Sequence, residues 1–141
     1  MKRKRVLFLC TGNSCRSQIA EGFLRSVGGD RFEAFSAGAR PAGYVHPLAI
    51  RAMRELNIDI SRHVSKSVDA FQGQSFDYLI TLCDDAREAC PTHAGAAKQL
   101  HWGIDDPAQA PGDDEEVMAN FSRVRDEIRR RIELFLAGRH E

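Results

Sequence analysis

One stretch near the amino terminus constrains the fold most strongly, because it links an apolar strand to a helix through a short polar loop. The apolar run is Val6 to Leu9, and the helical pattern begins near Ser17. In this arrangement the positive end of the helix dipole and the N–H groups of the loop point at the same place, which suits a tetrahedral oxyanion. The sequence therefore predicts an oxyanion-binding loop, whose members are Thr11, Gly12, Asn13, Ser14, Cys15, Arg16 and Ser17.

Cys10 stands at the junction of the strand and this loop. Helix N-termini and neighbouring cations stabilise a thiolate, so Cys10 is the predicted nucleophile. Arg16 brings a planar fork of donors for two oxyanion oxygens, and the Ser17 hydroxyl can donate to the Cys10 sulfur. Gly12 permits a close approach of the backbone to the anion, and Asn13 suits a left-handed turn position. The alternative, a buried structural cysteine beside an ordinary turn, does not require an arginine and a serine in this order.

Composition narrows the class of protein. The 141 residues, 43% of them hydrophobic, suit a single domain spanning residues 1–141. Twenty basic residues balance twenty acidic ones, so we expect no binding of nucleic acid. The apolar run that follows Lys2 to Arg5 is too short for a signal peptide or a membrane span. Four cysteines without a Cys-x2-Cys pair argue against a structural zinc site and favour a reducing cytoplasm; they are Cys10, Cys15, Cys83 and Cys90.

Strand and helix patterns alternate along the chain, which predicts an α/β fold: a small three-layer sandwich around a four-stranded parallel sheet. The predicted strands are Arg5–Leu9, Phe32–Ala37, Tyr78–Leu82 and Lys98–Trp102. The predicted helices are Ser17–Val27, Pro47–Leu56 and Asp113–Ala137, the first with an inward stripe of Ala20, Phe23, Leu24 and Val27. In such sheets ligands bind beyond the carboxyl ends of the strands, so we expect Cys10, Cys83 and the Asp105-Asp106 loop to meet in one crevice.

Cys83 and Cys90 flank a polar, helix-compatible segment, residues 84–89. In a helix their Cα atoms would be roughly 10 Å apart, whereas a disulfide requires about 7 Å or less. The two thiols could then bond only if the helix unwinds, which indicates a redox switch. The alternative is a pair of unrelated thiols, one at the end of a strand and one in a turn before Pro91.

These features together carry a resemblance that covers nearly the whole chain. The matching motifs are Cys10–Ser17, Gln18, Glu21-Gly22, Ser36–Gly38, Thr81–Cys83, Cys90-Pro91, His101–Gly103, Asp105–Pro107 and Arg123–Ile128. The chain resembles the thioredoxin-coupled arsenate reductases, which share the low-molecular-weight tyrosine phosphatase fold. The oxyanion loop alone would indicate only the wider phosphatase superfamily, whereas the loop with Cys83 and Cys90 is specific to the reductases.

The resemblance implies a sequence of thiol reactions on arsenate. Cys10 attacks arsenate held by the loop and Arg16, while Asp106 protonates the leaving oxygen. Cys83 then attacks Cys10 and releases arsenite, and Cys90 moves the disulfide to the Cys83–Cys90 pair, where thioredoxin reduces it. No cofactor is required by this scheme, and we expect a monomer. The scheme gives Cys15 no step, so its expected role is structural.

Asn13, Glu21, Ser36 and Lys66 are expected to support the loop. Some members of the family hold a potassium ion near the first three of these residues, with help from an acidic residue. Lys66 stands at the corresponding place here, which argues against a potassium site, and we expect its ammonium group to substitute for the cation. His101 and Trp102 are expected to pack or to form hydrogen bonds rather than to react.

Three other functions remain as alternatives at this point. A phosphotyrosine hydrolase would share the first step, but such enzymes usually carry apolar residues where Thr11 and Ser14 stand and an aromatic residue where Ala108 stands. In a reductase coupled to another thiol donor, Cys90 would have no evident role. A thiol sensor for arsenite would need neither the oxyanion loop nor an acid at Asp106.

Overall fold

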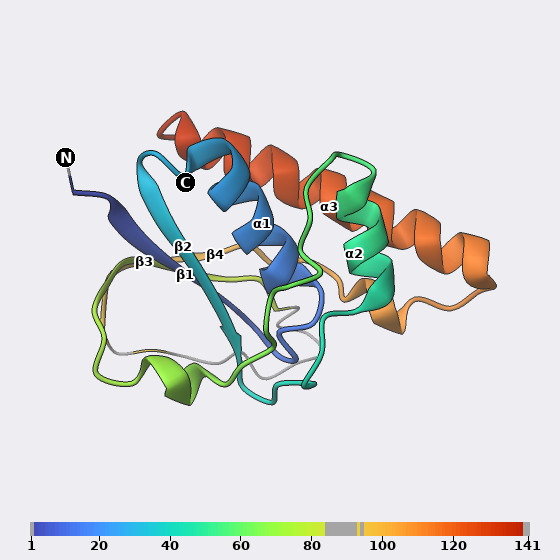
Figure 1. Cartoon of the computed structure of the whole chain (residues 1–141), viewed down its shortest axis with the longest axis horizontal. Coiled ribbons are helices and arrows are strands. Elements are labelled where there is room, and N and C mark those ends of the chain that lie inside the picture. The colour runs from blue at the N-terminus through green and yellow to red at the C-terminus, as the bar shows by residue number, and fades with distance from the viewer. Residues whose placement is uncertain (1, 84–92, 94, 140–141) are drawn as a thin grey trace.

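The computed structural model describes residues 2–83, 93 and 95–139 (Figure 1). Within these residues the fold is built on a four-stranded sheet in the order β2-β1-β3-β4, and each adjacent pair of strands is parallel. The strands are β1 (Lys4–Cys10), β2 (Phe32–Gly38), β3 (Phe76–Thr81) and β4 (Ala96–His101). The predicted α/β fold with a four-stranded parallel sheet is confirmed.

The order of the strands reverses at β1, which lies between β2 and β3. Its last residue, Cys10, is opposite Gly38, and its neighbour Leu9 is opposite Thr81 of β3. The carboxyl ends of all three strands therefore meet at one edge of the sheet. In open parallel sheets, this is where ligands bind.

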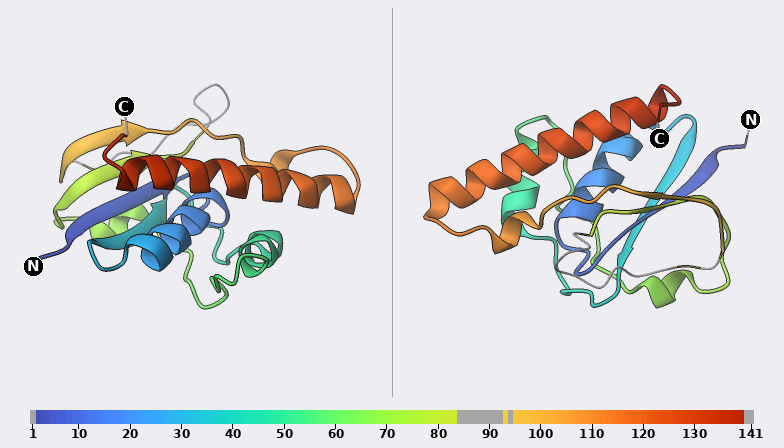
Figure 2. Two further views of the ribbon diagram at one scale, coloured as in Figure 1. Left: turned by 90° about the horizontal axis from the view of Figure 1, so that it is seen from above. Right: turned by 180° about the vertical axis from the view of Figure 1, so that it is seen from behind.

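Helices α1 (Arg16–Gly28) and α3 (Asp114–Leu136) lie over one face of the sheet, and α2 (Pro47–Arg54) packs against both of them (Figures 1 and 2). Side chains alternate along β1, so Val6 and Phe8 enter the core under these helices, while Leu7 and Leu9 face the other side. There the described part of the chain supplies a short 3₁₀ helix, η1 (Val68–Phe71). Within the described residues, Phe71 of this 3₁₀ helix packs on that face with Leu7 and Leu9.

One predicted core position in helix α1 is wrong. Val27 was expected on the inward stripe, but its side chain is 55% exposed. Gly28 takes the inward position instead, where a Cβ atom would lie 2.9 Å from Leu136 Cδ2. The helix ends against the end of α3 at this point, so its last turn has room for a glycine and not for a larger side chain.

The other predicted elements exist, with shifted ends. Helix α2 stops at Arg54, because the chain turns through Asn57, whose φ is +61°. Helix α3 begins one residue after Asp113, which forms a capping box with Glu116. The 3₁₀ helices η1 and η2 (Pro107–Gln109) were not predicted. No helix in the described residues is long and apolar enough to span a membrane.

Candidate active site

The predicted oxyanion loop lies between the end of β1 and the start of α1, and its carbonyl groups are held outward. The N–H groups of Ala39, Arg40, Ala42 and His46 donate to the carbonyl oxygens of Cys10, Thr11, Gly12 and Ser14, at 2.9 to 3.3 Å. A peptide group whose oxygen is held outward directs its N–H to the opposite side. The segment after β2 therefore shapes the loop into a concavity lined by N–H groups, which suits an anion.

Two backbone features allow this shape. Asn13 adopts the left-handed conformation expected of it, with φ +49°. Gly38, at the end of β2, must lack a side chain, because a Cβ atom there would lie 2.6 Å from the carbonyl oxygen of Thr11. At Gly12 a Cβ atom would lie 3.6 Å from Ser14 Oγ, the nearest atom among the described residues beyond its chain neighbours. Among these residues nothing excludes a side chain there, so the expected need for glycine rests on the close approach of the anion.

The start of α1 also suits an anion. Its N-cap residue, Cys15, forms no side-chain hydrogen bond with the first turn. The first N–H groups of a helix lack partners within the helix and are commonly satisfied by such a cap or by a bound ligand. Arg16 and Ser17, the first two helical residues, are buried beside the loop.

Cys10 is 2% exposed, and its sulfur lies 2.8 Å from the hydroxyl oxygen of Ser17. Asn13 Nδ2 donates to the same hydroxyl oxygen at 2.8 Å. Because Ser17 Oγ accepts from Asn13, its own proton is directed to the sulfur of Cys10. This hydrogen bond places a donor at the sulfur, and the thiolate is the nucleophilic form of a cysteine.

Arg16 ties the loop to two distant segments. Its Nη1 donates to the carbonyl oxygens of Leu82, at 3.3 Å, and Ile104, at 3.0 Å. Its Nη2 lies 3.8 Å from Asp106 Oδ2. Asp106 Oδ1 accepts from the backbone N–H of Ala108 at 3.0 Å, so Oδ2 is the oxygen that faces the loop. The Asp105-Asp106 segment therefore lies against the oxyanion loop, as expected.

Cys83 lies two residues after the end of β3 and is fully buried. The N–H of Leu82 donates to the carbonyl oxygen of Leu9 at 2.8 Å, which holds the end of β3 alongside the end of β1. Cys83 therefore begins its segment next to the strand that carries Cys10. Cys90 and the segment expected to be helical, residues 84–89, lie outside the described residues.

Cys15 differs from Cys10 in its surroundings. It is 3% exposed, and burial raises the pKa of its thiol to about 12. A hydrogen bond from Ser14, at 3.5 Å, opposes this effect only in part. Cys15 therefore stays protonated at neutral pH, which agrees with a structural role.

The four residues expected to support the loop lie together behind it. Ser36 Oγ donates to Glu21 Oε1 at 2.6 Å, and Lys66 Nζ lies 3.9 Å from the same oxygen. The backbone N–H of Lys66 donates to Asn13 Oδ1 at 2.9 Å. Glu21 is 4% exposed, and these partners supply the polar contacts that a buried carboxylate requires.

Sequence reasoning missed three members of this cluster. Arg25 Nη2 lies 3.0 Å from Glu21 Oε2, and the i, i+4 spacing on one helix was a signal for this pair. Gln18 Nε2 donates to Asn13 Oδ1 at 3.0 Å and its Oε1 lies 3.0 Å from His63 Nδ1. No local signal pointed to His63, because it comes from a loop far along the chain.

His101 and Trp102 lie beside the site without entering the loop. His101 Nδ1 is 2.6 Å from Thr81 Oγ1, at the ends of β4 and β3. Trp102 is 3% exposed and packs between the rings of Phe8 and Phe135, at 6.1 and 6.3 Å. No group of three or more histidine, cysteine or acidic side chains within the described part of the chain could hold a metal ion.

Comparison with known proteins places this geometry in a family. Residues 5–140 match the family model of the low molecular weight phosphotyrosine protein phosphatases. The chain is 48% identical over 135 residues to an arsenate reductase of Halalkalibacterium halodurans, covering 96% of each protein.

Solved structures agree with this match. An arsenate reductase in its phosphate-binding state has a TM-score of 0.81 and 33% identity, over 96% of this chain and 98% of that one. A thioredoxin-dependent arsenate reductase of Corynebacterium glutamicum has a TM-score of 0.62 and 29% identity, over 94% of this chain and 63% of that one. The chain therefore belongs to the low-molecular-weight phosphotyrosine protein phosphatase family, within its group of arsenate reductases.

Proposed function

We propose that this protein reduces arsenate to arsenite for arsenic detoxification. Cys10 is the nucleophile, and Cys83 and Cys90 are the thiols that supply the two electrons and end as a disulfide. The observation that carries the proposal is the placement of a further buried cysteine, Cys83, just beyond the end of β3, the strand that runs beside the one that carries Cys10. A phosphatase of this fold needs only water in the second step, whereas a reductase needs a thiol there. The curated relative named above is an arsenate reductase.

In the first step the sulfur of Cys10 forms a bond to arsenic and one arsenate oxygen leaves. The N–H groups of the loop and the guanidinium of Arg16 hold the remaining oxygens and stabilise their charge. Asp106 Oδ2 faces Arg16 and is placed to protonate the leaving oxygen, which departs as water. The hydrogen bond from Ser17 keeps the sulfur reactive until arsenate binds.

In the second step the sulfur of Cys83 attacks the sulfur of Cys10. The Cys10–Cys83 disulfide forms while the bond between sulfur and arsenic breaks, and its electron pair stays on arsenic. Arsenic is thereby reduced from the pentavalent to the trivalent state, and the two thiols together lose two electrons. Arsenite then leaves the loop.

In the third step the sulfur of Cys90 attacks Cys83 and frees Cys10, leaving a Cys83–Cys90 disulfide. We propose that thioredoxin reduces this disulfide, in a cytoplasm that keeps the other thiols reduced. The dependence on thioredoxin named for the Corynebacterium glutamicum neighbour supports this choice of donor.

The proposal is tested by arsenate-dependent consumption of NADPH with thioredoxin and thioredoxin reductase present. The native protein should turn over continuously, and leaving out arsenate or thioredoxin should abolish the signal. Activity with glutathione and glutaredoxin but not with thioredoxin would show that glutathione is the thiol donor. No turnover with either donor, together with tight binding of arsenite, would favour a thiol sensor.

Hydrolysis of phosphate esters is the second candidate, because the loop chemistry suits phosphate as well as arsenate. Ala108, which follows Asp106 and Pro107, offers no ring against which a phenyl group could stack. We therefore expect only slow hydrolysis of p-nitrophenyl phosphate. Hydrolysis faster than arsenate reduction would reverse the assignment.

A further inference from the structure

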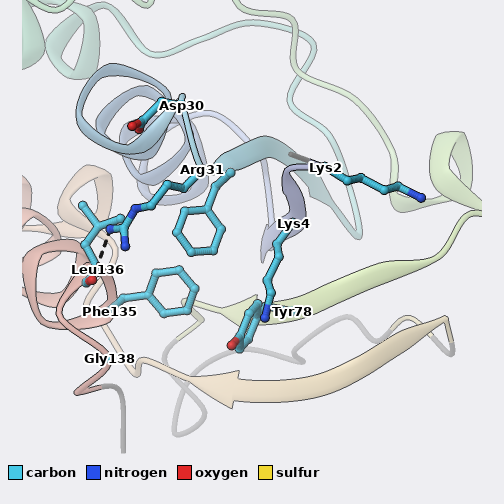
Figure 3. A pocket seen from close by; sticks show the side chains of 9 residues that line it. Lys2, Lys4, Asp30, Arg31, Tyr78, Phe135, Leu136 and Gly138 are labelled. Atoms are coloured by element: carbon cyan, nitrogen blue, oxygen red, sulfur yellow. Dashed lines mark hydrogen bonds between the residues drawn. The ribbon is translucent and has the colours of Figure 1, made fainter.

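A pocket of about 350 Å³ lies at the end of the sheet opposite the oxyanion loop (Figure 3). It is lined by the start of β1, the turn before β2, the middle of β3 and the end of α3. The lining residues are Lys2, Lys4, Asp30, Arg31, Phe32, Tyr78, Phe135, Leu136 and Gly138. Strand β1 runs from Lys4 at this pocket to Cys10 at the loop, so the two places are roughly 20 Å apart.

Three aromatic rings form the apolar part of the pocket. The ring of Phe135 lies 5.2 Å from that of Phe32 and 5.0 Å from that of Tyr78, the second pair edge to face. Phe32 and Tyr78 are half-buried, and both line the pocket. Such rings favour a further aromatic ring in a stacked or edge-to-face position.

One wall of the pocket is already closed by Arg31. Its Nη2 donates to the carbonyl oxygen of Leu136 at 3.1 Å, and its guanidinium lies 5.5 Å from the centre of the Phe32 ring (Figure 3). This arginine links the turn before β2 to the end of α3. The arrangement holds the aromatic rings in place without a ligand.

The amino-terminal arm supplies the charge. Arg3 and Arg5 are engaged with other groups: Arg3 lies 3.7 Å from Glu33, and Arg5 donates to the carbonyl oxygen of Ser75 at 2.7 Å. Lys2 and Lys4, which alternate with them, line the pocket, and among residues 2–83, 93 and 95–139 neither has an ion pair or a side-chain hydrogen bond.

Figure 3 shows Lys4 extending toward Tyr78, while the carboxylate of Asp30 points away from the rings. An aromatic surface that lines the pocket thus lies beside an ammonium group that no acidic residue in the described part of the chain neutralises. The complementary ligand has a ring and a negative charge. We propose that this pocket binds a small aromatic anion of the aryl carboxylate class, with its ring against Phe32 and Tyr78 and its charge at Lys4.

The proposal is independent of the reaction at Cys10 and is tested by a two-dimensional ¹H–¹⁵N NMR titration with benzoate. The largest shifts should fall on residues 2–4, 30–32 and 135–138. Benzamide, which has the same shape without the charge, should bind several-fold more weakly. Lys4→Glu should weaken benzoate binding about fivefold or more.

Arg51→Glu is the control, because Arg51 is an exposed basic residue on α2 that does not line the pocket. It should bind benzoate as the native protein does. Lys4→Met removes the positive charge without adding a negative charge that repels benzoate. Its affinity for benzoate should lie between those of the native protein and Lys4→Glu. Shifts confined to residues 10–17, equal binding of benzamide, or unchanged binding by Lys4→Glu would each overturn the proposal.

Discussion

The hydroxyl of Ser17 lies 2.8 Å from the sulfur of Cys10, and its proton is directed there because Asn13 occupies the hydroxyl oxygen as a donor. This contact links the first turn of α1 to the end of β1. It places a donor at the one atom whose charge the reaction requires.

Ser17→Ala should therefore slow the first step. A hydrogen bond to a charged group contributes about 1.5 to 3 kcal/mol, which corresponds to a loss of about tenfold or more in reactivity. The measurement is the rate at which iodoacetamide alkylates Cys10 at neutral pH, together with arsenate turnover. Ser26→Ala, at an exposed position of the same helix, is the control and should change neither rate. Equal alkylation of Cys10 in both variants would show that the contact does not activate the sulfur.

Asp106→Asn should lower the rate of the first step by a factor of about 10² to 10⁴, the usual contribution of a general acid. Asparagine keeps the shape of the side chain and can still accept from the Ala108 N–H, so the fold should be retained. The neighbouring Asp105 is the control, because its side chain is 70% exposed and, within the part of the chain that the structure describes, would lose only a distant contact with Arg123, at 4.0 Å. If Asp105→Asn were as slow as Asp106→Asn, the assignment of the acid would be wrong.

Cys15 makes the stability of the protein depend on pH. Burial raises the pKa of its thiol from 9.0 to about 12, so between these values the unfolded chain releases a proton that the folded protein keeps. The stabilising effect is complete below pH 9 and is lost as the pH rises toward 12, by up to about 1.4 kcal/mol per pH unit. Urea unfolding at a series of pH values should show a smaller loss for Cys15→Ala than for the native protein. Equal slopes would mean that Cys15 ionises as readily in the folded state as in the unfolded chain.

We propose that Lys66 takes the place of a bound cation. Lys66 and Arg25 both face the buried carboxylate of Glu21, so little negative charge remains to attract potassium. Turnover of the native protein should be the same in potassium chloride and in choline chloride at equal ionic strength. Lys66→Asp should become dependent on potassium, while Lys98→Asp should not. Strong activation of the native protein by potassium would contradict the substitution.

The sequence predicted the meeting of distant groups better than it predicted the ends of elements. Parallel strands share an edge, so Cys10, Cys83 and Asp106 could be placed near one another from the strand pattern alone. The left-handed position of Asn13 was likewise accessible, because few residue types adopt it. These inferences needed only local chemistry and one rule of topology.

The remaining features depend on tertiary contacts that no local pattern encodes. Val27 fits a helical stripe, yet Gly28 faces the core because α3 ends against it. His63 contacts Gln18 from a loop 45 residues away. The 3₁₀ helix η1 packs on one face of the sheet, but its four residues are too few for a periodic pattern to predict it. Such positions are fixed by the packing of neighbouring elements.

The central claim is that Cys83 attacks Cys10, forms a disulfide with it and thereby releases arsenite. It is tested most directly by mixing Cys90→Ser with arsenate and no other reductant, followed by peptide mapping under acid quench. The account predicts one arsenite released per protein and a disulfide between the peptides that contain Cys10 and Cys83. Release of arsenite without this disulfide, or no reaction until an external thiol is added, would contradict it.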